Sequence, residues 1–253
     1  MKKKKKLIHS ILNWHYNNNS THFFLYKNDM ALSSSNNNKM LHSTNNLQLA
    51  NKVEYSEKGS NIIKSSNLNE LKDEIVNFSG CSLQKTSTNF VFSDGNSKSK
   101  VMVIGEAPGE EEDKTGKPFK GKAGILLDKM LSAIGQNRNN TYITNIIFWR
   151  PPGNRNPTEE EINICLPFVL KHIEIINPKV LILAGAIAAK AVLKESRGII
   201  ELRGKWHNLP ISKSTNIKTM PIFHPAFLLR QPSRKKEAWE DLKKIKKEID
   251  LIT

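Results

Sequence analysis

From about residue 71 onward, short apolar runs alternate with amphipathic segments. The apolar runs predict four buried strands, at 101–104, 142–148, 180–183 and 220–223. Apolar residues at helical spacing predict helices over 125–134, 162–173, 186–193 and 238–249. This alternation, with crossovers of this length, favours a mainly parallel sheet covered by helices on both faces. The predicted fold class is therefore α/β, a three-layer α/β/α domain with a four-stranded mainly parallel sheet.

Local signals mark the ends of two of these helices. Thr158 followed three residues later by Glu161 forms a capping box, which predicts the start of the helix through 162–173. That helix is expected to end before Pro178, and Gly135 is expected to end the helix over 125–134.

Residues 1–70 differ in composition from the rest, since they contain 14 Asn and 10 Ser. Such a segment buries too little apolar surface to offset the entropy lost on ordering. We expect an N-terminal extension that is largely linker, in which only 7–14 has the apolar spacing of a short helix. The folded domain is expected to span 71–253.

The chain is strongly basic, with 39 basic and 24 acidic residues and a formal net charge of +15. Residues 71–253 hold 29 of the basic and 20 of the acidic residues, so the predicted domain is basic in its own right. An excess of this size favours a polyanionic partner such as nucleic acid, although a lysine-rich surface that only contacts solvent is an alternative.

The chain contains two cysteines, Cys81 and Cys165, a count that indicates a reducing compartment. No run approaches eighteen consecutive apolar residues, which argues against a transmembrane helix. Met1 and the five lysines after it imitate a signal peptide, but polar residues interrupt the apolar stretch that follows. We therefore expect a cytoplasmic protein without a membrane partner.

In sheets of this kind a ligand binds beyond the carboxyl ends of the strands, so the residues after each strand form the candidate site. The first strand is followed by GEAPGEEED, residues 105–113, in which glycines permit close approach to the backbone and Glu106 stands at the strand end. A phosphate-binding P-loop is a poor alternative, because the spacing differs and four consecutive acidic residues repel phosphate. A solvated acidic loop is the other alternative for residues 110–113.

The second strand ends in TNIIFWRPPGNRNP, residues 144–157. The amide of Asn145 offers both a donor and an acceptor, which suits the edge of a nucleobase, although a lone Asn in a strand is more often structural. Arg150, Asn154 and Arg155 surround prolines and a glycine in a loop that we expect to be rigid and to contact phosphates.

The fourth strand is followed by HPAFLLRQP, residues 224–232. His224 stands where it can donate a hydrogen bond to a developing anion, although an isolated His is more often a packed core residue. An apolar wedge followed by a basic residue suits insertion into a base stack. The residues of this wedge are Phe227, Leu228 and Leu229, with Arg230 after them.

Taken together, these segments resemble the uracil-DNA glycosylase superfamily, and most closely its family 4 branch. GEAPGEEED is similar to the first motif of that family and HPAFLLR to the second, and the blocks GKPFKGKAG, ITNII and RPPGNRNPT stand between them in the same order. The resemblance extends from about residue 75 to about residue 248. It implies a four-stranded parallel sheet between helices and an enzyme that acts on uracil-containing DNA in base excision repair. We expect a monomer.

The resemblance also implies roles for individual residues. Phe119 would stack on the flipped base, Asn145 would bind its Watson–Crick edge, and Gly105 would line the uracil pocket. His224 would donate to the base carbonyl beside the glycosidic bond. Hydrolysis would leave an abasic site in an intact strand.

One difference from the family concerns the residue that orients the attacking water. Better known relatives have an aspartate at the position of Ala107, which cannot act as a base. Glu106 is the nearest ionisable candidate, either for orienting water or for stabilising the cationic sugar.

One departure from the family pattern concerns a cofactor. Typical family 4 members bind a 4Fe–4S cluster through four cysteines, and Cys81 and Cys165 match two of these positions, whereas Phe78 and Trp149 occupy the others. Because such clusters need thiolate ligands, we expect no cluster and no other cofactor. A disulfide or another metal shared by the two cysteines is the alternative.

Two other classes of function remain. A catalytically inactive DNA-binding relative would keep the basic loops but would leave Glu106 and His224 unexplained. A metal-dependent nuclease would use residues 110–113 as magnesium ligands, although carboxylates consecutive in sequence do not readily converge on one ion.

Overall fold

The computed structural model describes residues 63–212 and 215–252. The segment 7–14 and most of the predicted extension lie outside the described residues. Helix α2, Leu68–Val76, begins before residue 71 and buries Leu71 and Ile75, so the ordered fold already includes the last residues assigned to the extension.

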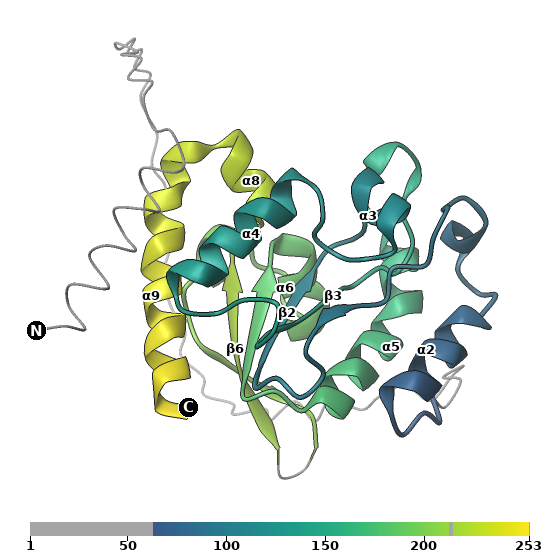
Figure 1. Ribbon diagram of the computed structural model, residues 1–253, viewed down its shortest axis with the longest axis horizontal. Helices are drawn as coiled ribbons and strands as arrows, with labels where there is room; N and C mark the ends of the chain where they lie inside the picture. The colour runs from purple at the N-terminus through teal and green to yellow at the C-terminus, as the bar shows by residue number, and fades with distance from the viewer. Residues whose placement is uncertain (1–62, 213–214, 253) are drawn as a thin grey trace, which may run out of the picture. The chain divides into compact units, whose positions relative to one another are not determined.

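A six-stranded sheet forms the centre of the domain (Figure 1), with the strand order β1-β3-β2-β4-β6-β5. Its strands are β1 Asp94–Gly95, β2 Val101–Gly105, β3 Tyr142–Asn145, β4 Val180–Ala184, β5 His207–Pro210 and β6 Asn216–Ile222. The four middle strands, β3, β2, β4 and β6, are parallel, as predicted. The predicted number of strands was too low, because β1 and β5 add short antiparallel edges.

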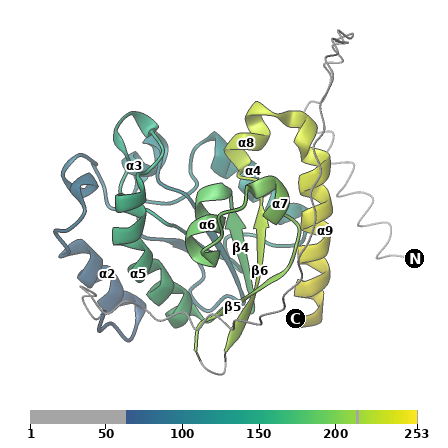
Figure 2. The same cartoon turned by 180° about the vertical axis from the view of Figure 1, so that it is seen from behind.

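Helices cover both faces of the sheet (Figures 1 and 2). Those of eight or more residues, besides α2, are α4 Lys122–Ala133, α5 Glu159–Ile176, α6 Ala186–Leu193 and α9 Lys235–Ile252. Shorter helices are α3 Glu110–Thr115, α7 Ile199–Leu202 and α8 Pro225–Arg230, and the 3₁₀ turns are η1 Ser82–Lys85, η2 Pro152–Asn154 and η3 Pro232–Arg234. None of the helices in the described ranges is long and apolar enough to cross a membrane.

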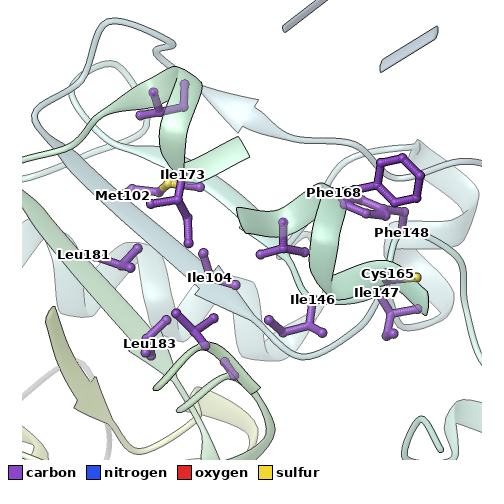
Figure 3. Packing of buried hydrophobic residues seen from close by; sticks show 14 of the residues in the cluster. Met102, Ile104, Ile146, Ile147, Phe148, Cys165, Phe168, Ile173, Leu181 and Leu183 are labelled. Atoms are coloured by element: carbon purple, nitrogen blue, oxygen red, sulfur yellow. The ribbon is translucent and has the colours of Figure 1, made fainter. Parts of the chain in front are cut away.

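Alternation along the strands divides the core into two layers. In β2, Met102 and Ile104 pack with residues of α2, α5 and α6, as Figure 3 shows in part. The neighbouring residues Val101 and Val103 pack on the other face with α4 and α9. Successive side chains of a strand point to opposite faces, so an all-apolar strand requires helices on both sides. This arrangement confirms the predicted three-layer architecture.

The predicted capping box is present at the start of α5. Thr158 Oγ1 accepts a hydrogen bond from the backbone N–H of Glu161, and the Glu161 carboxylate accepts one from the N–H of Thr158. The helix ends at Ile176, and Asn177 follows in the left-handed conformation with a φ of 47°. The capping residues therefore set the ends of α5 as the sequence indicated.

A buried polar pair joins β3 to α5. Tyr142 Oη lies 2.7 Å from His172 Nε2, and His172 Nδ1 has no hydrogen-bond partner among the described residues. Burial lowers the pKa of His172 from 6.5 to about 3. The imidazole is therefore neutral in the folded protein at physiological pH.

Protonation of His172 should destabilise the fold in acid. The pKa of His172 is lower in the folded than in the unfolded state, so protonation favours the unfolded state. The contribution of neutral His172 to the free energy of unfolding is therefore complete above pH 6.5 and is lost progressively as the pH falls toward 3. Between about pH 7.5 and about pH 5, the free energy of unfolding should decrease by about 2 kcal/mol less in the His172→Gln variant than in the wild type. Urea titrations of both proteins at the two pH values measure the free energies of unfolding. An equal pH effect in both proteins would contradict the assignment.

Candidate active site

The carboxyl ends of the central strands bring the predicted site residues to one edge of the sheet. Gly105, the last residue of β2, is paired with Asn145, the last residue of β3. The pairing continues one step further, because the N–H of Ile147 donates to the carbonyl of Glu106 at 3.0 Å. On the other side of β2, the N–H of Gly185 donates to the carbonyl of Ile222, two residues before His224.

Gly105, Phe119 and Asn145 are in close contact. A Cβ atom added at Gly105 would lie 2.5 Å from Asn145 Oδ1 and 2.5 Å from the ring of Phe119. The side chain of Asn145 is buried, with only 2% of its surface exposed. The amide of Asn145 and the ring of Phe119 therefore meet over a backbone segment that has no room for any side chain.

The ring of His224 completes this group. It stacks on Phe119 with ring centroids 5.7 Å apart and an interplanar angle of 27°. A close approach to β4 also fixes its position, since a Cβ at Gly185, which has a φ of 99°, would lie 3.0 Å from His224 Cβ. Three separate strand ends and the loop before α4 thus converge at one point.

The hydrogen bonding of His224 determines which nitrogen carries its proton. His224 is the N-cap of α8, and its Nδ1 accepts a hydrogen bond from the N–H of Ala226 at 3.1 Å. Burial and then the nearby charge of Arg230 lower the pKa of His224 to about 4, although Glu112 acts in the opposite direction. At neutral pH the ring is therefore neutral, with its proton on Nε2, where it can donate to a ligand.

Glu106 lies at the same edge, directly after β2, and is half-buried. Burial raises its pKa, and the positive charge of Arg230 partly offsets that effect. Arg230 therefore acts electrostatically on both ionisable residues of the candidate site, Glu106 and His224. The neighbouring Ala107 offers no ionisable group.

The acidic residues of α3 have internal structural partners. Glu112 accepts hydrogen bonds from the N–H groups of Gly109, Lys120 and Gly121. Asp113 accepts from the N–H groups of two residues in the segment before β1. The two carboxylates therefore hold separate loops, an arrangement that does not favour the metal-dependent nuclease.

The loop after β3 is compact and internally paired. Arg150 Nε donates to Asn154 Oδ1 at 2.8 Å, and its guanidinium lies 3.9 Å from the carboxylates of Glu110 and Asp113. Arg155 forms a two-pronged ion pair with Glu161, at 2.9 and 2.6 Å, and 43% of its side chain remains exposed. The arginines are thus fixed by acidic partners, and their availability to phosphates is reduced.

Helix α8 does not present the predicted apolar wedge as a unit. Leu228 is completely buried in the core, and half-buried Phe227 packs on Phe223 with ring centroids 5.0 Å apart. Leu229 remains exposed, at 43%, beside exposed Arg230. The prediction that Leu228 contacts DNA was wrong, because residues 225–230 form a helix that turns this side chain into the core.

Several supporting residues were not identified from the sequence. Arg138 donates to the backbone carbonyl of Phe119, Glu112 holds the next two amides, and Gly185 accommodates His224. The glycine after the strand at 180–183 was a usable signal for Gly185. Nothing in the local sequence pairs Arg138 with a loop about twenty residues earlier.

Comparison with known proteins identifies relatives of the whole domain. The family model of the uracil DNA glycosylase superfamily matches residues 92–243. The type-4 uracil-DNA glycosylase of Archaeoglobus fulgidus is 38% identical over 182 residues, which cover 70% of this chain and 91% of that protein. The type-4 uracil-DNA glycosylase of Thermotoga maritima is 40% identical over 179 residues, with the same coverage of 70% and 91%. That of Sulfurisphaera tokodaii is 39% identical over 184 residues, 71% of this chain and 83% of that protein.

These relatives contradict the expectation that the protein has no cofactor, because type-4 uracil-DNA glycosylases are known for a 4Fe–4S cluster. In this chain Cys81 and Cys165 are free, buried thiols, and a hydrogen bond with Cys165 lowers the pKa of Cys81. Phe78 packs on Phe168, and Trp149 on Phe90. Cys81 and Cys165 would supply two thiolate ligands to such a cluster. Across residues 63–212 and 215–252, no three His, Cys, Asp or Glu side chains gather as a metal site.

Proposed function

The chain belongs to the uracil DNA glycosylase superfamily, and we propose that it flips uracil out of DNA and hydrolyses the N-glycosidic bond. The reaction leaves an abasic site in an intact strand, as the first step of base excision repair. The observation that carries this proposal is the meeting of Phe119 and Asn145 over the bare backbone of Gly105, with His224 stacked on Phe119. We further propose that the protein acts as a monomer in the cytoplasm.

The proposed pocket recognises the base by shape and by its hydrogen-bonding edge. The ring of Phe119 would stack on the flipped uracil, and the amide of Asn145 would pair with its Watson–Crick edge. Asn145 suits this role because it is buried and held by the pairing of β2 with β3. A group fixed by the sheet loses little entropy when the base binds.

The proposed chemistry consists mainly of stabilising two opposite charges. The C1′–N1 bond breaks with its electron pair on uracil, and a water molecule adds to the cationic sugar and loses a proton. The Nε2–H of neutral His224 would donate to the carbonyl that gains negative charge, and Arg230 would add a favourable field. Glu106 would face the sugar, where its carboxylate either orients the water or stabilises the cation.

The proposed DNA contacts differ in their exposure. Leu229 and Arg230 are exposed at the end of α8 and would enter the space that the flipped nucleotide leaves in the duplex. Phe227 would support them from below through its contact with Phe223. Arg150, Asn154 and Arg155 would contact phosphates through the groups that their internal partners leave exposed.

The proposed activity is tested by release of free uracil from uracil-containing single-stranded DNA, with alkali-labile sites as the second readout. The Asn145→Asp variant should lose this activity, because a carboxylate faces the uracil carbonyl where an amide N–H donated before. Asn208→Asp, the same change at an exposed position of β5, is the matched control and should retain full activity. A wild-type protein that releases no uracil would refute the proposed function, and a fully active Asn145→Asp variant would remove Asn145 from recognition.

A second prediction separates the chemical and structural roles of His224. Replacement by Ala removes both the Nε2 donor and the N-cap acceptor, whereas His224→Asn keeps a capping oxygen for α8. Both variants should lose roughly a hundredfold to a thousandfold in single-turnover rate, because the donor acts on a charge that forms only in the transition state. DNA affinity should change little. A His224→Asn variant with the wild-type rate would exclude the donor role.

A third prediction concerns the exposed leucine of α8. Leu229→Ala should slow uracil excision most when the uracil is paired with adenine, and much less in a mismatch or a single strand, where less unstacking is needed. Leu251→Ala, which removes a leucine that is 73% exposed on α9, is the control and should have no such effect. Single-turnover rates on the three substrates measure the difference. An equal loss on all three would argue against insertion of Leu229.

A further inference from the structure

The backbone around Phe119 is held in an unusual conformation. Phe119 has a φ of 55°, in the left-handed region that residues with a Cβ rarely adopt. Its side chain is nonetheless 95% buried against Gly105 and His224, with only 5% of its surface exposed. A conformation of this kind persists only where the surroundings determine it, and it concentrates at functional sites.

One guanidinium binds the backbone carbonyls of this turn. Arg138 donates from Nη2 to the carbonyl of Phe119 and from Nη1 to the carbonyl of Pro118, at 3.1 Å in the second case. Its Nη1 also donates to Asp94 Oδ2 at 2.7 Å, and its Nε donates to Asp128 Oδ1 at 3.0 Å. The side chain is 19% exposed, so these are partly desolvated charged hydrogen bonds.

The same network continues on the other side of the phenylalanine. Lys120 Nζ lies 2.9 Å from Asp94 Oδ2, so the carboxylate of Asp94 joins the residue after Phe119 to Arg138. Gly124 leaves space for the turn, since a Cβ there would lie 1.8 Å from the carbonyl oxygen of Phe119. The loop before α4 is thus fixed to strand β1, at the edge of the sheet.

We propose that Arg138, supported by Asp94, is a positioning residue that orients the ring of Phe119 for stacking on the base. This inference rests on the proposed function, and it assigns Arg138 no contact with substrate. Its carbonyl contacts set the backbone of Phe119, and the backbone directs the ring toward Asn145 and His224. The base-binding step should therefore depend on Arg138 more than the bond-breaking step does.

The planar fork of arginine is needed for this role. Arg138 reaches two consecutive carbonyls and two carboxylates at once, whereas the single ammonium of a lysine cannot span them. Arg138→Lys keeps the charge and most of the side-chain volume, so it tests the geometry of the fork. Arg197→Lys is the matched control, because Arg197 is 46% exposed and forms an ion pair with Glu195 nearby on the surface.

The test is a double-mutant cycle between Arg138→Lys and Phe119→Ala in the full-length chain. The readouts are the inhibition constant of free uracil, and the half-saturating concentration and maximal rate of single-turnover excision on single-stranded DNA. Arg138→Lys should weaken uracil inhibition roughly tenfold or more, because it removes charged hydrogen bonds that set the loop. It should change the maximal rate much less, and Arg197→Lys should match the wild type.

In the Phe119→Ala background, Arg138→Lys should have almost no further effect on uracil inhibition, because no ring remains to be positioned. An equal loss in both backgrounds would show that Arg138 acts only as a structural link, and would overturn the inference. So would a Phe119→Ala variant with unchanged uracil inhibition. If Arg138→Lys lowers thermal stability enough to obscure the result, Asp94→Asn takes its place in the same cycle, with a smaller loss expected.

Different results would refute uracil excision and the positioning role of Arg138. A wild-type protein that neither releases uracil nor binds free uracil refutes the proposed function itself. A wild-type protein that releases uracil, with additive effects of the two substitutions, refutes only the role of Arg138.

Discussion

The constraint on which the candidate site depends is steric, and it lies at Gly105. Two neighbouring parallel strands end there, and Asn145 Oδ1 and the Phe119 ring approach the backbone so closely that no Cβ fits. Because all strands of a parallel sheet end at the same edge, this one bare position brings together side chains from distant parts of the sequence. The stacking of Phe119 on His224 depends on it, since a displaced ring at residue 119 would no longer face the loop after β6.

Charge is used inside the loops as much as at the surface. Glu112 and Asp113 were candidates for ligands or for a solvated face, yet each binds backbone N–H groups of a different segment. Carboxylates in this role replace the hydrogen bonds that an irregular loop cannot make with itself. Arg150 lies within 3.9 Å of two carboxylates of α3, so the acidic helix also orders the basic loop after β3. The number of basic residues therefore overstates how many cationic groups are free to contact a polyanion.

The sequence predicted the elements whose signal is local. Helix α6 has the predicted bounds, and the capping box at Thr158 begins α5, because apolar spacing and caps act over a few residues. The edge strand β5 was missed, since His207 to Pro210 carries one buried apolar residue and owes its conformation to pairing with β6. That the strand-end residues lie together followed from their positions, whereas the burial of Leu228 and the contact of Arg138 with Phe119 depend on tertiary packing.

His224 shows how the fold prepares a side chain for the proposed chemistry. Its Nδ1 must accept a hydrogen bond in order to cap α8, so the one proton of the neutral ring is held on Nε2. Burial and the charge of Arg230 keep the ring neutral, and a neutral donor needs no counter-charge in this buried position. The negative charge that develops on the base would then meet an N–H dipole and a nearby guanidinium that are already oriented. Helix capping, which is ordinarily a matter of stability, in this way selects the tautomer that the proposed reaction requires.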